Sequence, residues 1–331
     1  MKKTTAYIIG IILLVIIAVL FYLKDEKNTL DASVSDFALE KEEAPDSLVL
    51  KQDSLVSTLS LQHGKWMLNN RYHAREKAVN QLFNVLQDIQ VESPATQSSK
   101  KTVLELVREN PLHIKIYRKG IKIKDFLVED SQMKKGTTYM LMSGANEPFL
   151  MNLPGYNGDI ALLLRADPDY WRDKTLFDYS GIDISKVEVI YPEKKSKSFI
   201  LTYNKKDQFV LNNAFKKGGI EKVNTSKAAR YLSYFSNIFY EKILVHSEEL
   251  KDSLKKETPY CIISVEDVNG KTKTLNTFRK LSEGQKDEFG QESYYDLNHL
   301  YGVFNEFGDI LLIKYTEIDP LFKEIDYFRV E

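Results

Sequence analysis

One six-residue pattern occurs twice in the sequence, as Lys65-Trp66-Met67-Leu68-Asn69-Asn70 and as Gln208-Phe209-Val210-Leu211-Asn212-Asn213. Each copy follows a stretch of alternating apolar and polar residues that is typical of a strand, residues 57–61 in the first case and Phe199–Tyr203 in the second. A recurring order of elements is the mark of an internal repeat. The sequence on the C-terminal side of each pattern extends the likeness.

An amphipathic helix is predicted after each pattern, over residues 75–90 and 226–242. Apolar residues recur there at intervals of three and four, which places them on one face of a helix. A second, shorter helix and two hairpins are predicted next in both halves. Their predicted ranges are 98–109, 112–128 and 138–153 in the first half, and 247–257, 260–278 and 294–315 in the second. The turn Asn269-Gly270 is a strong hairpin signal.

The shared order of strand, strand, helix, helix, hairpin and hairpin predicts a tandem duplication. We therefore expect an α+β fold, in which an N-terminal transmembrane helix precedes two tandem copies of a module made of an antiparallel sheet and helices. The copies are predicted over residues 37–176 and 177–331.

An unbroken apolar run of 18 residues, 6–23, comes before both copies. A helix of this length covers about 27 Å, which is close to the thickness of the hydrocarbon core of a bilayer. Bulky residues at the end of the run offer no small-residue cleavage site, so residues 1–24 are predicted to be an uncleaved signal anchor. The alternative is a buried core helix, which the lack of a polar face disfavours.

The charges beside the run indicate its orientation. Lys2 and Lys3 precede it, and Lys24 and Lys27 follow it together with two acidic residues. The positive-inside rule favours a cytoplasmic N-terminus by a small margin, which places the rest of the chain outside the cytoplasm. Residues 25–36 are predicted to be an acidic, solvated tether between the bilayer and the first copy.

Several strings carry a resemblance to a known family. They include Gly64-Lys65-Trp66, Ile114-Lys115-Ile116-Tyr117, Leu153-Pro154-Gly155-Tyr156-Asn157-Gly158 and Trp171-Arg172-Asp173-Lys174-Thr175-Leu176-Phe177-Asp178. Over nearly all of residues 37–331 the sequence resembles the bacterial membrane-anchored family of domain of unknown function 4340. The resemblance implies one membrane helix and a periplasmic α+β domain at the inner membrane. Some members are encoded near ABC-type transporters of the gliding-motility type, which implies an accessory role by association.

The sequence contains no motif of a known chemistry. Phosphate-binding loops, dinucleotide-binding glycine patterns, zinc-protease motifs and nucleophile elbows are absent. None of the five histidines pairs with another at the spacing of common zinc sites, and the single cysteine, Cys261, lies in an apolar run typical of a core strand. The net charge of −1 provides no overall positive field that would attract nucleic acid. We predict a non-enzymatic protein with no catalytic residues, metal, cofactor or nucleic-acid partner.

The junction between the copies holds the candidate residues for an interface or a ligand: Tyr156, Asn157, Trp171, Arg172 and Asp173. Tryptophan and arginine are enriched at interface hot spots. In the structural alternative, Trp171 fills the junction of the two copies while Arg172 pairs with a carboxylate. Residues 154–158 are most simply a turn, or else the lip of a groove between the copies.

Lysines at 194–197, 205–206 and 216–217 alternate with aromatic residues. They predict either contact with anionic lipid or polymer, or protection of strand edges, and the second interpretation is favoured.

Three classes of function remain open. The first is an interaction or accessory subunit of an inner-membrane assembly, held in the membrane by residues 6–23 and bound to a protein partner. The second is a ligand-binding module with a cleft between the copies. The third is an extracytoplasmic enzyme that uses Asp167, Asp169 or Asp173 as acid and base. The anchor and the lack of catalytic motifs favour the first class.

Overall fold

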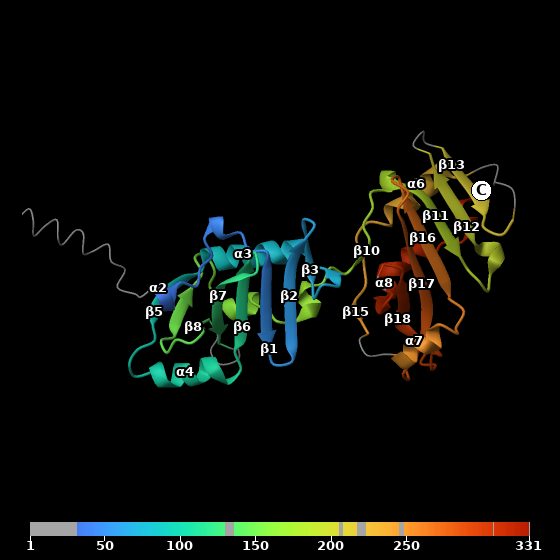
Figure 1. Cartoon of the computed structure of the whole chain (residues 1–331). Helices are drawn as coiled ribbons and strands as arrows, with labels where there is room; N and C mark the ends of the chain where they lie inside the picture. The colour runs from blue at the N-terminus through green and yellow to red at the C-terminus, as the bar shows by residue number, and fades with distance from the viewer. Residues whose placement is uncertain are drawn as a thin grey trace, which may run out of the picture. The chain divides into compact units, whose positions relative to one another are not determined.

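The computed structural model describes residues 32–129, 136–204, 208–216, 223–244, 248–306 and 308–330. The chain divides into two compact units, Met1–Asp173 and Lys174–Glu331. Each unit is built on an antiparallel sheet with helices, so the chain is an α+β protein (Figure 1). The apolar run 6–23 lies outside the described residues. Within the described ranges, no helix is both long and apolar enough to cross a membrane.

The described part of the first unit forms a nine-stranded sheet in the order β4-β3-β2-β1-β6-β7-β8-β9-β5. The central strands alternate buried and half-buried residues, as expected when one face of a sheet lies on the core. The strands are β1 (Ser47–Gln52), β2 (Leu55–Gln62), β3 (Lys65–Leu68), β4 (Tyr72–His73), β5 (Gln90–Pro94), β6 (Leu112–Arg118), β7 (Ile121–Val128), β8 (Thr138–Met142) and β9 (Phe149–Asn152).

Two helices pack on opposite faces of this sheet. The helix α3 (Glu76–Asp88) buries Leu82 in the main core, which also holds Phe126 of β7. The helix α4 (Lys100–Glu109) buries Val103 in a second cluster, against which Leu127 packs. Successive residues of a strand point to opposite faces, so Phe126 and Leu127 assign the two helices to the two faces. The shorter helices of the unit are α2 (Ala32–Ser35), η1 (Lys41–Glu43), η2 (Ile160–Leu163) and α5 (Pro168–Trp171).

The described part of the second unit forms an eight-stranded sheet in the order β13-β12-β11-β16-β17-β18-β19-β15. A separate pair, β10 and β14, lies beside it in the same unit. The strands are β10 (Thr175–Phe177), β11 (Ile184–Ile190), β12 (Phe199–Tyr203), β13 (Phe209–Asn213), β14 (Ile238–Phe239), β15 (Lys242–Ile243), β16 (Cys261–Asp267), β17 (Thr272–Leu281), β18 (Tyr295–Phe304) and β19 (Ile310–Lys314).

Helices also pack on both faces of the second sheet. The helix α6 (Thr225–Ser233) begins at Asn224, whose side chain accepts a hydrogen bond from the amide of Lys227, and it buries Tyr231 among aromatic rings. The helix α7 (Glu248–Leu254) packs on the other face, where Leu254 meets Phe278. The other helices are η3 (Gly181–Asp183), η4 (Lys195–Lys197), α8 (Tyr315–Ile318), η5 (Asp319–Leu321) and η6 (Ile325–Phe328).

Two small residues lie inside the second sheet. A Cβ atom on Gly302 of β18 would lie 2.5 Å from Cδ1 of Ile313 and 3.1 Å from Cδ1 of Leu275, so glycine leaves the room that these methyl groups occupy. Cys261 of β16 is fully buried, which confirms the predicted core thiol. Burial raises the pKa of that thiol well above its usual range.

The predicted hairpins over 112–128, 138–153 and 260–278 are confirmed. The helix predicted over 226–242 is wrong in length, because α6 ends at Ser233. Asn237 then adopts a left-handed conformation with φ of 57°, and Ile238–Phe239 turns away to pair with β10. The last residues of the predicted tether, Ala32–Ser35, form the short helix α2.

Candidate functional site

The segment that contains the predicted site begins with the short helix α5. Asp167 is its N-cap and accepts a hydrogen bond from the amide of Asp169 at 2.8 Å, while Pro168 occupies the first turn. Aspartate and proline are both preferred at these positions, which explains why the helix starts here. Arg172 ends the helix with an extended backbone. Its backbone then forms an antiparallel bridge with Ala74.

Trp171 is fully buried in the core of the first unit. Its indole Nε1 donates a hydrogen bond to the carbonyl of Arg165 at 2.6 Å, and its own carbonyl accepts one from the amide of Arg75 at 2.7 Å. A buried indole usually needs such a partner. Trp171 therefore fixes the segment to the sheet, and its ring is not exposed to a partner.

Arg172 is also buried, with 8% of its surface exposed. Its Nη1 pairs with Oδ1 of Asp169 at 2.6 Å, and its guanidinium lies 4.6 Å from the centre of the Tyr72 ring. Its Nε is buried without a hydrogen-bond acceptor among the described residues. The carboxylate pairing expected for this residue is thus present. Asp173, next in the chain, is exposed, and its amide bonds to the carbonyl of His73 at 2.9 Å.

The exposed groups near Trp171 are arginines stacked on tyrosines. The guanidinium groups of Arg75 and Arg165 each lie 4.7 Å from the centre of the Tyr170 ring, and that of Arg71 lies 5.1 Å from the Tyr72 ring. All three arginines are exposed, and both tyrosines are half-buried. Each such contact contributes about 0.5–1 kcal/mol at an exposed site. We call these five residues the arginine–tyrosine surface.

Tyr156 and Asn157 lie elsewhere in the first unit. The hydroxyl of Tyr156 donates to the carbonyl of Asp159 at 3.3 Å, and Asp159 accepts a hydrogen bond from Thr138 of β8. Asn157 is exposed in the turn. By contrast, α5 packs against β2. Four strand spacings separate β2 from β8, which is about 19 Å. The structure therefore brings Trp171, Arg172 and Asp173 together and leaves Tyr156 and Asn157 apart from them.

A polar cluster that the sequence analysis missed lies on the face of the first sheet that also carries α4. Oδ1 of Asp125 contacts His113 Nε2 at 2.6 Å and accepts a hydrogen bond from the hydroxyl of Ser143, while Oδ2 pairs with Lys122. Burial alone would raise the pKa of Asp125, but the hydrogen bonds from Lys122, Ser143 and His113 hold it well below its usual range.

This cluster does not form a nucleophile–base–acid relay. Ser143 donates to the carboxylate of Asp125, and the same nitrogen of His113 faces both residues. A catalytic triad instead places the histidine between its partners and uses both ring nitrogens. The arrangement stabilises an ionised aspartate.

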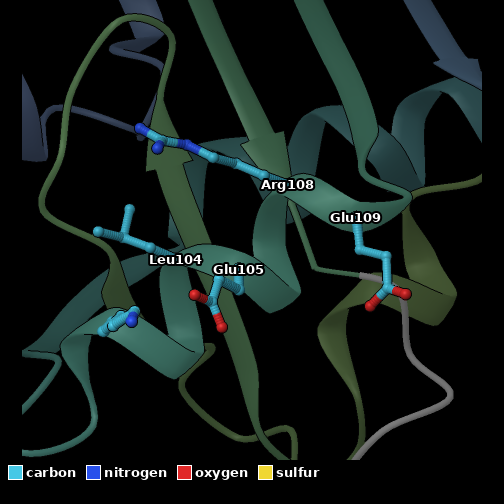
Figure 2. A pocket seen from close by; sticks show the side chains of 5 residues that line it. Leu104, Glu105, Arg108 and Glu109 are labelled. Atoms are coloured by element: carbon cyan, nitrogen blue, oxygen red, sulfur yellow. The ribbon is translucent and has the colours of Figure 1, made fainter.

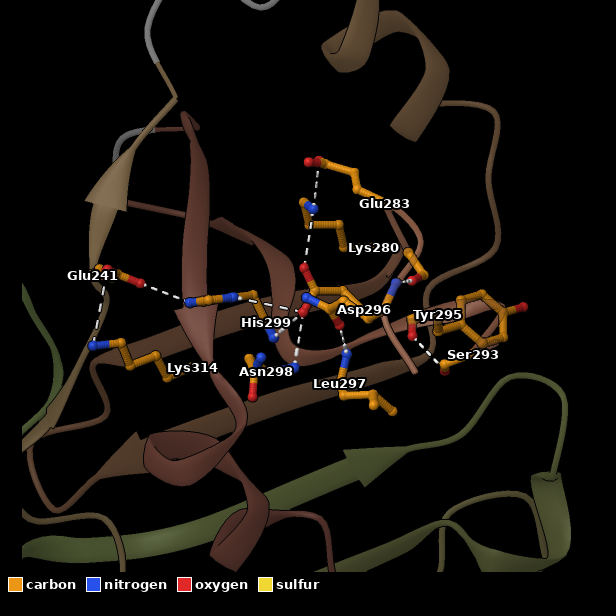
Figure 3. Close-up of polar contacts among 12 residues, drawn as sticks. Glu241, Lys280, Glu283, Ser293, Tyr295, Asp296, Leu297, Asn298, His299 and Lys314 are labelled. Carbon is orange, nitrogen blue, oxygen red and sulfur yellow. Dashed lines mark hydrogen bonds and ion pairs between the residues drawn. The ribbon is translucent and has the colours of Figure 1, made fainter. Parts of the chain in front are cut away.

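The second unit contains a longer network of acidic and basic side chains (Figure 3). Lys280 lies between Glu283 and Asp296, at 2.9 and 3.0 Å, and His299 lies between Asp296 and Glu241, at 3.6 and 2.9 Å. Lys314 pairs with Glu241 at 3.8 Å. These contacts connect β17, β18, β19 and the residue that precedes β15.

Within this network of side chains, the pKa of Asp296 is lowered and that of Lys280 is raised. Burial raises the pKa of Asp296, but hydrogen bonds from the amide of Asn298, from Lys280 and from the amide of His299 outweigh it and lower the value to about 2. The hydrogen bond to Glu283, followed by that to Asp296, raises the pKa of Lys280 to about 12 against its burial. Both groups are charged at neutral pH.

A shallow hollow of about 490 Å³ lies along α4 (Figure 2). Its lining residues come from one helix: Lys101, Leu104, Glu105, Arg108 and Glu109. Arg108 donates to the carbonyl of Ala145 and to Asn146 at 3.0 and 2.8 Å, so it holds a neighbouring loop. Ligand sites normally enclose a ligand with apolar walls. This open hollow is lined by one helix and does not enclose a ligand. No group of three His, Cys, Asp or Glu side chains in the described ranges is placed to hold a metal ion.

The chain belongs to the family described as Domain of unknown function (DUF4340), whose model matches residues 66–258. The match includes α5, all five residues of the arginine–tyrosine surface and the first part of the second unit. Comparison with curated proteins and with solved structures found no match.

Proposed function

We propose that the protein is a non-enzymatic, single-pass protein of the bacterial inner membrane, whose periplasmic domain binds a protein partner as an accessory subunit. The 18-residue apolar run supports the anchor, and the positive-inside rule supports the periplasmic side. The resemblance to proteins encoded near ABC-type transporters supports a transporter subunit as the partner. The membership of the family supports no particular reaction.

The observation that carries the proposal is the contact of two exposed guanidinium groups, of Arg75 and Arg165, with the Tyr170 ring, each 4.7 Å from its centre. Tyrosine and arginine are the residues most enriched at interface hot spots together with tryptophan. The buried Trp171 fixes the backbone next to this ring, so little conformational entropy is lost when a partner binds. Rigid, exposed and rich in arginine, the arginine–tyrosine surface has the chemistry of a protein contact.

We further propose that the two units arose by duplication. Apart from the edge strand β4, the strands of the first sheet correspond in order to those of the second: β3-β2-β1-β6-β7-β8-β9-β5 with β13-β12-β11-β16-β17-β18-β19-β15. In both units, one helix packs on the core face and the next helix packs on the other face. An identical order of eight strands supports common descent more strongly than the sequence pattern does.

The test is copurification of the full-length protein from its native membrane in mild detergent. A stoichiometric membrane partner is expected, and its recovery should fall at least tenfold for R75A/R165A. The matched control is K101A/K119A, which removes two exposed cations elsewhere in the same unit. A variant without residues 1–24 should leave the membrane fraction. Recovery of the wild-type protein alone, as a monodisperse species, would contradict the proposed function.

The alternative of a ligand-binding module receives no specific support from the described residues. The hollow beside α4 is shallow, and its arginine is already engaged by a loop.

A further inference from the structure

A second exposed surface lies at the edge of the sheet in the second unit, where β13 ends beside η4 (Figure 1 shows β12 and β13). Asn213 organises it. Its amide nitrogen donates to the carbonyls of Ser196 and Ser198 at 3.1 and 3.0 Å, and its Oδ1 accepts from the amide of Phe215 at 3.0 Å. One side chain therefore fixes two turns against each other.

The two turns present a lysine over an exposed aromatic ring. The ammonium of Lys195 lies 5.5 Å from the centre of the Phe215 ring, and 51% of Phe215 is exposed. Lys194 and Lys216, their neighbours in the sequence, are exposed as well. We call Lys194, Lys195, Phe215 and Lys216 the Lys195–Phe215 surface.

The lysines of this surface differ from their neighbour Lys197. Lys197 pairs with Glu324 and Asp326 at 2.8 and 3.0 Å, whereas no ion pair within the described part of the chain involves the three lysines of the surface. Along the sequence, residues 193–222 contain eight lysines and three acidic residues in a chain whose net charge is −1. The sequence around the surface is thus rich in positive charge, and no ion pair among the described residues neutralises Lys194, Lys195 or Lys216.

We propose that the Lys195–Phe215 surface docks onto the anionic headgroups of a lipid bilayer. This inference rests on the membrane anchor of the proposed function, which would hold the chain at such a bilayer. Lysines attract anionic lipid, and an aromatic ring inserts at the boundary of headgroups and acyl chains.

Single-stranded nucleic acid fits this surface less well. Bases bind by stacking on a free aromatic face, and Lys195 covers one face of Phe215. The interpretation favoured in the sequence analysis, protection of strand edges, would require only the lysines. It does not account for the exposed phenylalanine, whose backbone amide is bonded to Asn213.

The test uses the full chain in lipid nanodiscs made of neutral lipid alone or with an anionic lipid added. S196C provides a site for an environment-sensitive fluorophore on the exposed side of η4. Cys261 is fully buried, so position 196 is the site that labels in the folded protein. Retention of the chain on neutral discs shows that the N-terminal anchor is inserted in the bilayer. Quenching of the fluorophore by headgroup-labelled lipid shows that the Lys195–Phe215 surface lies at the headgroups.

Quenching is expected on anionic discs and not on neutral ones, and it should decline with added salt. Each lysine near an anionic surface strengthens association about fivefold, so K194E/K195E should weaken it at least about 25-fold. F215A should weaken it too, while K256E/K286E, with the same change of charge elsewhere in the unit, should not.

Retention on neutral discs without quenching on anionic discs would overturn the lipid proposal and leave the anchor in place. Equal quenching on both kinds of disc would also overturn it, because charge would then not matter. Protection of the fluorophore only when a copurified protein is present would assign the surface to a protein partner. Quenching on anionic discs by a chain that neutral discs do not retain would support the lipid proposal and contradict the anchor.

Discussion

Trp171 and Arg172 are adjacent in the chain and have different structural roles. The indole is buried and bonded to the carbonyl of Arg165, while the guanidinium is packed on Tyr72 and paired with Asp169. Trp171 packs edge-on against the half-buried ring of Tyr170, with ring centres 4.9 Å apart, and Arg172 packs against the ring of Tyr72. A residue can thus contribute to a contact surface without being part of it.

The first prediction concerns Trp171. Trp171→Ala should lower the free energy of unfolding of the first unit by about 3–5 kcal/mol, because it removes a fully buried aromatic side chain and leaves a cavity. Urea unfolding followed by circular dichroism measures this change. Trp66→Phe, at the half-buried tryptophan, is the control and should cost much less. Equal losses for the two variants would contradict the assigned role.

The second prediction concerns acid. The folded-state pKa of Asp296 is about 2, below its unfolded value of about 3.9, so its stabilising contribution is present above about pH 4 and is lost as the pH falls toward 2. The contribution is about 2 kcal/mol. Asp296→Asn should remove this part of the pH dependence, as measured by urea unfolding at several pH values. Asp183→Asn, at an exposed aspartate, should retain it.

At the scale of elements, local signals decided which predictions were correct. The hairpin at Asn269-Gly270 was predictable because glycine with φ of 82° fits the turn and the flanking residues alternate. The end of α6 was not, because Ile238 and Phe239 continue the helical spacing of apolar residues. Only the left-handed Asn237 and the partner strand β10 show that they belong to β14.

The candidate site was likewise predictable only in part. The Trp-Arg-Asp string located α5, but the part of Tyr170 in the surface became apparent only from the fold, which places Arg75 against its ring. The cluster around Asp125 joins residues from β6, β7 and the turn after β8, and a shift of register between Ile116 and Tyr117 helps to place Lys122. Sequence spacing alone does not encode such a register.

The third prediction concerns the fit of β18 against its neighbours. Gly302→Ala should destabilise the second unit by about 1–3 kcal/mol, because its Cβ would meet Cδ1 of Ile313 at 2.5 Å. Ile313→Val removes that methyl group and costs about 1 kcal/mol alone. The double variant should therefore be less destabilised than the sum of the two, by about 1 kcal/mol. Strict additivity in urea unfolding would refute the proposed contact.

At the scale of the whole molecule, each unit has its own sheet and its own buried side chains. Domains with separate cores fold separately as a rule. The two halves of the chain can therefore carry different surfaces, an arginine–tyrosine surface on the first unit and a lysine–phenylalanine surface on the second, without a change in the order of their strands.

The fourth prediction follows from this division. Residues 32–173 and 174–330, produced separately, should each give a dispersed amide spectrum by nuclear magnetic resonance and a cooperative urea transition. A cut after Asp173 follows the boundary between the two compact units along the sequence. A fragment that shows no cooperative transition on its own would contradict independent folding.

Cys261 offers a direct way to observe opening of the second unit. It is the single cysteine of the chain, fully buried in β16, with a thiol whose pKa burial raises. A thiol reagent can react with it only when β16 becomes accessible. Under conditions where reclosing is faster than labelling, the rate of modification of the native protein gives the free energy of that opening. The wild-type chain thus contains its own probe of rare excursions from the folded state, and no engineered label is needed.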